Sequence, residues 1–283
     1  MSRSNRLPVL GAALNVADLQ RVEGLRDFIL EHQRDVEVQD FIAVEALRGD
    51  GWRERAEAAA RAFGGYSGRL GIHGPFWGFD LATPDPDVRA VAKARIDAGL
   101  EVCRIMNGDR GGAHFVVHSP FTTWHWYNRG TRPASSDPTI ELVHLCLGDA
   151  VRKAADHGIT IVIENIEDKD PAERVALARS FASPAVKVSI DTGHAHYAFG
   201  ATGAPPVDVY VRAAGDMLAH VHLQDADAVA DRHWAIGRGT ILWPAVFEAL
   251  GELEELPRLI LEMNDAVDVL PSARWLAERG LAI

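Results

Sequence analysis

The stretch from His220 to Gly239 gathers histidines, aspartates, arginines and two glycines directly behind a short apolar run. The segment Ala219–Leu223 is typical of a buried strand whose polar side chains appear where the strand meets its following loop. In that loop, Asp231 and His233 offer a carboxylate and an imidazole two positions apart, and both groups bind transition metals. A polar loop with its histidines facing solvent explains this stretch alone equally well. The ends of the other strands must therefore decide between the two interpretations.

Short apolar segments alternate with longer amphipathic ones along the whole chain. The apolar segments predict strands over Val9–Val16, Phe41–Leu47, Arg69–Phe76, His114–Pro120, Thr160–Ile166, Val186–Thr192, Leu218–Asp225 and Arg258–Met263. The amphipathic segments predict helices over Asp18–Arg34, Trp52–Phe63, Asp87–Asn107, Pro138–His157, Pro171–Ser180, Val207–Asp216, Trp243–Leu250 and Pro271–Glu278, with Asp18, Asp137, Asp170 and Ser272 near their starts. Eight strand–helix repeats in 283 residues predict an α/β fold, a single (β/α)8 TIM barrel over residues 1–283. Such a barrel carries its active site at the C-terminal ends of its strands.

Six consecutive predicted strands end in side chains that can bind a metal. These side chains are His73, His118, Glu164, Asp191 with His194, His222 and Glu262. Each one alone also fits a salt bridge or a hydrogen-bonded core histidine. Together they are costly to gather at one end of a buried barrel unless a cation compensates them. Mixed histidine and carboxylate ligands suit Zn, Mn, Fe or Co rather than calcium.

The composition limits the other classes of protein. A net charge of -11 argues against sequence-independent binding of nucleic acid. We expect a cytoplasmic protein without a membrane segment, because no apolar run is long enough for a signal peptide or a spanning helix. Cys103 and Cys146 lack a CxxC spacing and are expected to be buried free thiols. No glycine-rich nucleotide-binding motif follows any predicted strand. The oligomeric state stays open, a homo-oligomer included.

The strand ends resemble the xylose isomerase-like barrel superfamily, which contains sugar isomerases and epimerases and the apurinic endonucleases of the endonuclease IV type. The resemblance covers residues 9–263 and rests on the segments IEN, SIDTGHAH, HVHLQDAD, DRHWAIGRG and LEM. Similarity to the isomerases implies one catalytic divalent ion, held by Glu164, Asp191, His222 and Glu262. Similarity to the endonucleases implies two more ions, one held by Glu164, His73 and His118 and one by His194, Asp231 and His233. One to three ions per chain are therefore expected.

Several features favour a small sugar or sugar phosphate as the substrate. The segment HGPFWGFDLATPDPDVR looks like the isomerase version of strand three. His118 is followed by Ser119 and Pro120, where the endonuclease pattern has a Pro-Gly turn. We therefore expect a metal-dependent isomerase or epimerase in which Glu164 and Glu262 remove and return a proton through an enediolate.

The residues expected to contact the sugar are Glu45, Trp77, Trp124, His194, Arg232 and Arg238. The irregular segment Thr122–Asp137 is expected to shape the pocket, because long loops in compact domains are usually functional. Two alternatives stay open, a multinuclear phosphodiesterase and a binding barrel that has lost its activity. The sequence also leaves open whether His196 is a ligand or a bystander.

Overall fold

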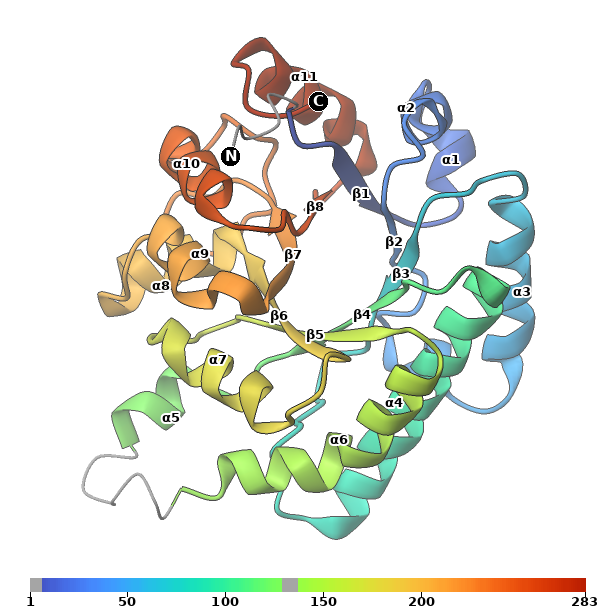
Figure 1. Cartoon of the computed structure of the whole chain (residues 1–283), viewed down its shortest axis with the longest axis vertical. Helices are drawn as coiled ribbons and strands as arrows, with labels where there is room; N and C mark the ends of the chain where they lie inside the picture. Colours follow the sequence, from blue (N-terminus) through green and yellow to red (C-terminus); the bar gives the residue numbers. More distant parts are fainter. Residues whose placement is uncertain (1–6, 129–136) are drawn as a thin grey trace.

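Eight parallel strands, in chain order, close into one barrel in which the first strand pairs with the last. The structure is a computed structural model that describes residues 7–128 and 137–283. The strands are β1 (Leu10–Leu14), β2 (Val36–Val38), β3 (Leu70–His73), β4 (His114–His118), β5 (Thr160–Glu164), β6 (Val186–Asp191), β7 (Leu218–Leu223) and β8 (Arg258–Leu261). Figure 1 shows the helices as a ring outside the strands. The predicted (β/α)8 barrel is confirmed.

Most helices bury an apolar face toward the outside of the barrel, whereas α5 buries none of its residues. They are α1 (Asp18–Arg21), α2 (Leu25–Glu31), α3 (Gly51–Ala62), α4 (Pro86–Asn107), α5 (Thr123–Asn128), α6 (Thr139–Asp156), α7 (Pro171–Ser180), α8 (Thr192–Thr202), α9 (Val207–Ala214), α10 (Trp243–Glu252) and α11 (Val269–Glu278). Short 3-10 helices are η1 (Val44–Leu47), η2 (Gly108–Arg110), η4 (Gly215–Met217) and η5 (Ala266–Asp268). Asp170 caps α7 as predicted, since its side chain accepts a hydrogen bond from the backbone of Ala172.

The predicted second strand over Phe41–Leu47 is wrong. The strand in this position is β2, only three residues long with a glutamate at its centre, and the residues from Val44 to Leu47 form η1. The apolar run was misleading because Phe41 and Leu47 are buried without belonging to the sheet: Phe41 lies in a turn and Leu47 in η1. Glu45 is exposed on η1 and does not end a strand.

Two predicted helices and one predicted irregular segment also differ from the structure. The helix predicted over Asp18–Arg34 is divided into α1 and α2 at Gly24, whose φ of 79° interrupts the helix. Ser272 lies inside α11, where its hydroxyl accepts from the backbone of Ile236, and so does not start a helix. The segment predicted to be irregular, Thr122–Asp137, contains α5, and residues 129–136 lie outside the described residues.

The barrel interior holds charged and polar side chains between its two ends. Successive side chains of a strand alternate between faces, so His220 and His222 of β7 both point into the barrel. Glu37 of β2 and His114 of β4 lie beside them, and all four side chains are at most 1% exposed. Most barrels of this type fill the same space with branched apolar residues. This chain therefore places ionisable groups in its core without interruption from the middle of the barrel to the strand ends.

One irregularity in the sheet sets the position of these histidines. Between β6 and β7 the register shifts at Val188 and Ser189, where β7 has one extra residue. Beyond the shift, Ser189 pairs with His220 and Asp191 pairs with His222. A bulge of this kind redirects the side chains that follow it.

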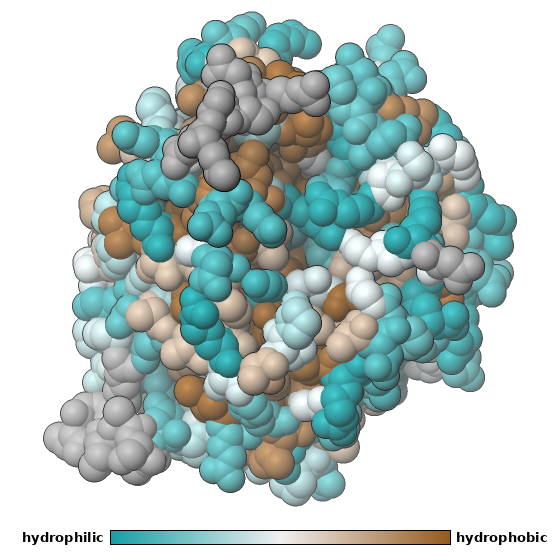
Figure 2. Space-filling view, viewed as in Figure 1, coloured by the Kyte–Doolittle hydropathy of each residue, from teal (hydrophilic) through white to brown (hydrophobic). Residues whose placement is uncertain are grey.

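Apolar side chains from the strands and the inner helix faces form the core around the barrel. Cys103 and Cys146 are buried and free, as predicted. Figure 2 shows hydrophilic residues over the outer helices, with hydrophobic residues visible between them toward the centre of the face. Across residues 7–128 and 137–283, no helix combines the length and apolar character needed to cross a bilayer.

Candidate metal centre

Four predicted ligands meet at the carboxyl ends of four consecutive strands. Glu164, Asp191, His222 and Glu262 each offer one ligand atom, and these four atoms lie within 4.8 Å of one another. Nδ1 of His222 contacts Glu164 and lies 3.3 Å from Oε2 of Glu262. All four residues are buried. The strand ends therefore converge on one position, as the sequence predicted.

The charges of this group call for a cation. Oε2 of Glu164 and Oδ2 of Asp191 are buried and make no hydrogen bond with any described residue. Burial raises the pKa of Asp191 to about 6, even though His194 and His233 attract its ionised form. Burial also opposes ionisation of Glu164, but His222 and His73 outweigh it and hold the pKa of Glu164 well below its usual value. The group consists of three carboxylates and one imidazole, and two of its carboxylate oxygens accept no hydrogen bond from the described residues. Such a group fits a divalent transition metal.

A second group of possible ligands shares Glu164. Nε2 of His73 and Nε2 of His118 each lie 3.4 Å from Oε2 of Glu164, and they lie 3.3 Å from each other. Nδ1 of His73 faces the carbonyl of Gly74 at 2.7 Å, so its proton belongs there and Nε2 keeps a lone pair. Burial and the neighbouring His73 lower the pKa of His118 to about 3, which keeps its ring neutral. Two imidazoles and one carboxylate oxygen could therefore hold a metal.

A third group lies where the loop after β7 returns to the barrel. Nε2 of His194 lies 3.3 Å from Oδ2 of Asp231, and Nε2 of His233 lies 3.2 Å from Oδ1 of the same carboxylate. Asp191, His194 and His233 together offer ligand atoms within 4.8 Å of one another. Burial opposes protonation of His233, but Asp231 and Glu262 outweigh it and raise the pKa of His233 to about 9. The structure thus brings all nine predicted metal ligands into three adjoining groups.

Backbone and amide contacts fix these ligands in place. Asn165 binds the backbone of Asp191 through both side-chain atoms, which joins the ends of β5 and β6. Oδ1 of Asp191 accepts from the backbone of His194 and caps α8. Gln224 donates to both Asp191 and Asp231, at 3.1 Å and 2.8 Å. These partners orient the Asp191 and Asp231 carboxylates and leave Oδ2 of Asp191 without a hydrogen bond from the described residues.

The loop that carries Asp231 and His233 is itself anchored by Asp225. The buried Asp225 carboxylate accepts hydrogen bonds from the backbone of Gly237 and from the indole of Trp243. Its backbone also exchanges two hydrogen bonds with Trp234 across the loop. The loop therefore presents its ligands from a fixed framework.

The predicted substrate residues occupy different surroundings. Trp77 and Trp124 are 76% and 77% exposed. Trp77 packs on Phe76 with ring centroids 5.2 Å apart, and Phe76 stacks on His118 at 4.5 Å, so this pair borders the second group of possible ligands. Among the described residues, no such link joins Trp124 or the exposed Glu45 to these side chains, and their substrate contacts stay predictions.

The arginines of the β7 loop are arranged around Trp234. Arg232 pairs with Asp227 at 2.9 Å and lies over the Trp234 ring at 5.2 Å. Arg238 lies over the same ring at 5.0 Å and is exposed. Nε2 of His196 contacts the Thr240 hydroxyl at 2.8 Å, and His196 belongs to none of the groups of possible ligands found among the described residues.

Sequence reasoning missed two polar residues that touch the ligands. Nε2 of Gln39, just after β2, donates to Oε1 of Glu262 at 2.6 Å. Oε1 of Glu37 lies 3.0 Å from Nε2 of His222. Both were hidden by the misplacement of the second strand. Apolar and polar residues alternate from Val36 to Gln39, which is typical of a strand with Glu37 and Gln39 on one face. This pattern could have revealed both residues.

Comparisons with known proteins agree with this architecture. A family model described as xylose isomerase-like TIM barrel matches residues 36–279. Among solved structures, a D-tagatose 3-epimerase-like protein is 20% identical, covers 95% of this chain and 96% of its own, and has a TM-score of 0.73. An L-ribulose 3-epimerase is 15% identical over 97% and 95% of the two chains, with a TM-score of 0.70. A Thermus thermophilus protein whose crystal was soaked with ZnCl2 is 23% identical over 95% and 96%, with a TM-score of 0.66. At these identities the solved structures establish the fold, and the family match, which spans most of the sequence, shows that the chain belongs to the xylose isomerase-like TIM-barrel family.

Proposed function

We propose that this chain is a divalent-metal-dependent isomerase or epimerase of a sugar or sugar phosphate. The observation that carries the proposal is the position of Glu164 and Glu262. Both carboxylates reach the same atom, Nδ1 of His222, so both border the same ligand position. The sugar epimerases among the structural neighbours support the same reaction class.

A divalent cation bound by Glu164, Asp191, His222 and Glu262 would polarise the carbonyl and neighbouring hydroxyl oxygens of a ketose and acidify the proton on the carbon between them. One glutamate removes that proton and leaves an enediolate. The other glutamate then gives a proton to the opposite face, which inverts that carbon, or to the neighbouring carbon, which moves the carbonyl. Gln39 holds Glu262 through Oε1 and leaves Oε2 directed at the ligand position.

The test is solvent deuterium exchange into the substrate. Enzyme loaded with Mn, Co or Zn is incubated in D2O with a panel of ketoses and ketose phosphates, and the product is analysed by NMR. The proposal expects deuterium on the carbon that receives the new proton, which is the inverted carbon in an epimerase product and the former carbonyl carbon in an isomerase product. Glu164→Gln should lower kcat by about 10² to 10⁴, the usual contribution of a general acid or base, while Glu248→Gln on the outer helix α10 should match the wild type. Wild-type-like turnover in Glu164→Gln would exclude Glu164 as the acid or base.

A second candidate function is hydrolysis of a phosphodiester by two or three metal ions. The observation in its favour is the pair of Nε2 atoms of His73 and His118 that converge on Oε2 of Glu164. A cluster of two ions can activate water and stabilise the leaving oxygen.

Metal content separates the two functions. Plasma mass spectrometry of protein purified without chelator should give about one equivalent of a transition metal for an epimerase and two or three for a hydrolase. His118→Asn should abolish hydrolysis of abasic DNA if the second function holds. It should leave deuterium exchange into a ketose within a few-fold of wild type if the first holds.

A further inference from the structure

Glu37 lies at the centre of the barrel, one layer below the proposed metal position. Its Oε1 is 3.0 Å from Nε2 of His222, and its Oε2 is 3.0 Å from Nε2 of His114 and 3.3 Å from Nε2 of His220. Glu37 and the three rings are at most 1% exposed. One carboxylate therefore faces three imidazoles in a space closed to bulk water.

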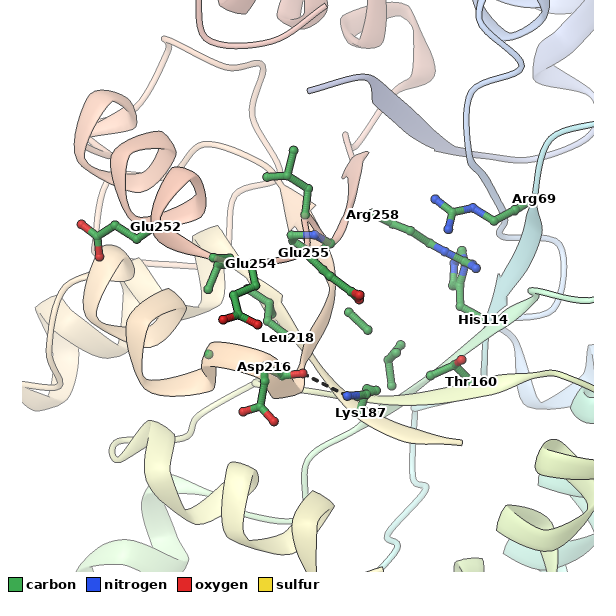
Figure 3. Close-up of a pocket in the computed structure, with 16 residues that line it drawn as sticks. Arg69, His114, Thr160, Lys187, Asp216, Leu218, Glu252, Glu254, Glu255 and Arg258 are labelled. Carbon is green, nitrogen blue, oxygen red and sulfur yellow. Dashed lines mark hydrogen bonds between the residues drawn. The ribbon is translucent and has the colours of Figure 1, made fainter. Parts of the chain in front are cut away.

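The contact between His114 and Arg258 fixes where the His114 proton lies. A guanidinium nitrogen of Arg258 contacts Nδ1 of His114, and Figure 3 shows the Arg258 side chain extending to His114 at the amino-terminal end of the barrel. A guanidinium can only donate hydrogen bonds. Nδ1 of His114 therefore accepts, the ring carries its proton on Nε2, and that proton is donated to Oε2 of Glu37.

The fold makes room for this arrangement. A Cβ atom at Gly71, on the neighbouring strand β3, would lie 2.2 Å from the His114 ring, so only glycine lets the ring enter the barrel. Beneath the ring lies a pocket of about 720 Å³ lined by the first residues of several strands, among them Thr160, Leu218 and Arg258. The contacts described above thus run from the floor of the barrel through its centre to the ligand His222.

The same contacts argue against a metal at the centre. Glu37, His114 and His220 offer ligand atoms within 4.8 Å of one another. However, Nδ1 of His114 accepts a hydrogen bond from Arg258, so Nε2 carries the ring proton and has no lone pair for a cation. The guanidinium already supplies a positive charge beside the ring. Hydrogen bonds from His114 and His222 to Glu37 fit these residues better than an ion.

We propose that Glu37 is a positioning residue for the metal ligand His222. Its carboxylate, oriented by Arg258 and His114, holds the His222 proton on Nε2 and thereby turns Nδ1 toward the position shared by Glu164 and Glu262. The inference rests on the proposed metal centre and adds to it the group that prepares His222 to bind. Partners of this kind usually change metal affinity by about 10- to 100-fold when they are removed.

The test compares Zn²⁺ binding by wild type and Glu37→Gln, measured by competition with a fluorescent chelator. Zn²⁺ affinity of the site should fall by about 10- to 100-fold, and the loss of that binding event in His222→Asn identifies the site. In Zn-loaded protein labelled with ¹⁵N-histidine, the Nε2 proton of His222 should resonate at low field and should move upfield in Glu37→Gln. Glu37→Asp keeps the charge on a shorter side chain and should weaken Zn²⁺ binding less than Glu37→Gln does. If Glu37→Gln does not fold, Glu37→Asp replaces it in the same measurements.

Asp168→Asn is the matched control, because Asp168 is a buried carboxylate whose partners are Arg174 and Ser119 rather than a proposed ligand. It should lose stability and keep the wild-type Zn²⁺ affinity. Unchanged Zn²⁺ affinity and an unchanged His222 resonance in Glu37→Gln would overturn the inference. Loss of a separate Zn²⁺ equivalent, with the His222 site unaffected, would overturn it in favour of a metal at the centre. A wild type that binds Zn²⁺ at His222 but exchanges no deuterium into any sugar would refute the proposed function and leave the role of Glu37 standing.

Discussion

Replacing Asp191 by asparagine should make the metal-free protein more stable at neutral pH, although Asp191 is a proposed ligand. The exchange keeps Oδ1, which accepts from His194 and Gln224, and asparagine is as good a helix cap as aspartate. It removes the charge from a side chain whose Oδ2 has no partner among the described residues. The metal-free wild type therefore retains a cost that the variant lacks.

The magnitude follows from the pKa of Asp191, which burial raises from 3.8 to about 6. Because the folded state holds the proton more tightly than the unfolded chain does, the wild type is most stable relative to the variant below pH 3.8. It loses that advantage as the pH rises through 6. Above pH 7 the ionised Asp191 should cost the folded protein about 3 kcal/mol. Urea unfolding in EDTA between pH 4 and pH 8 should show Asp191→Asn gaining stability over the wild type up to about that amount.

Saturating metal should reverse the order. A ligand at one hundred times its Kd stabilises a protein by about 2.7 kcal/mol, and the variant offers the cation one carboxylate fewer. Asp216→Asn, at an exposed carboxylate on the outside of the barrel, should show neither effect. The reasoning is refuted if Asp191→Asn in EDTA is less stable than wild type at pH 8, or if the difference does not change with pH.

Two further predictions concern other charged pairs. In metal-free protein, His233 has its pKa raised from 6.5 to about 9 in spite of its burial, with Asp231 as its closest partner. The contribution of protonated His233 to stability should be complete below pH 6.5 and lost as the pH rises through 9. Asparagine tolerates the φ of 45° at this position. In urea unfolding from pH 6 to pH 10, His233→Asn should therefore show a weaker dependence of stability on pH than the wild type. Arg174→Met should cost about 3 to 5 kcal/mol, because it leaves the buried Asp168 carboxylate without its cation. Arg179→Met, at an exposed ion pair, should cost less than about 1 kcal/mol in the same assay, and equal losses in the two variants would contradict the burial argument.

The strand ends of the second half of the barrel could be predicted because each is an apolar run that stops at a polar residue. Glu164 follows Val162 and Ile163, and Glu262 follows Leu261. The local pattern therefore predicts that each glutamate lies at the carboxyl end of a strand. Parallel strands of a barrel then bring these ends together without any further information. The centre of the site was therefore accessible from the sequence.

The residues that support the site were not accessible in the same way. β2 has three residues and a glutamate at its centre, and a nearby apolar run matches a strand better. Short strands of this kind are identified by their neighbours in the sheet, which a single sequence does not reveal. α8 was also missed, because its start directly follows Asp191 and its even mixture of small and aromatic residues has little helical periodicity.

The register shift between β6 and β7 has a consequence for how this sequence can change by insertion or deletion. A shift of one residue in a strand turns all its side chains to the opposite face. Loss of Val221 would make His220 and His222 direct neighbours in the strand, so that only one of the two rings could face the barrel interior and one layer of it would be lost. Lengthening an outer helix or a distant loop moves neither ring. Lineages of this barrel should therefore vary in length around its periphery while the span from Ser189 to Asp191 and its partner in β7 keep a constant number of residues.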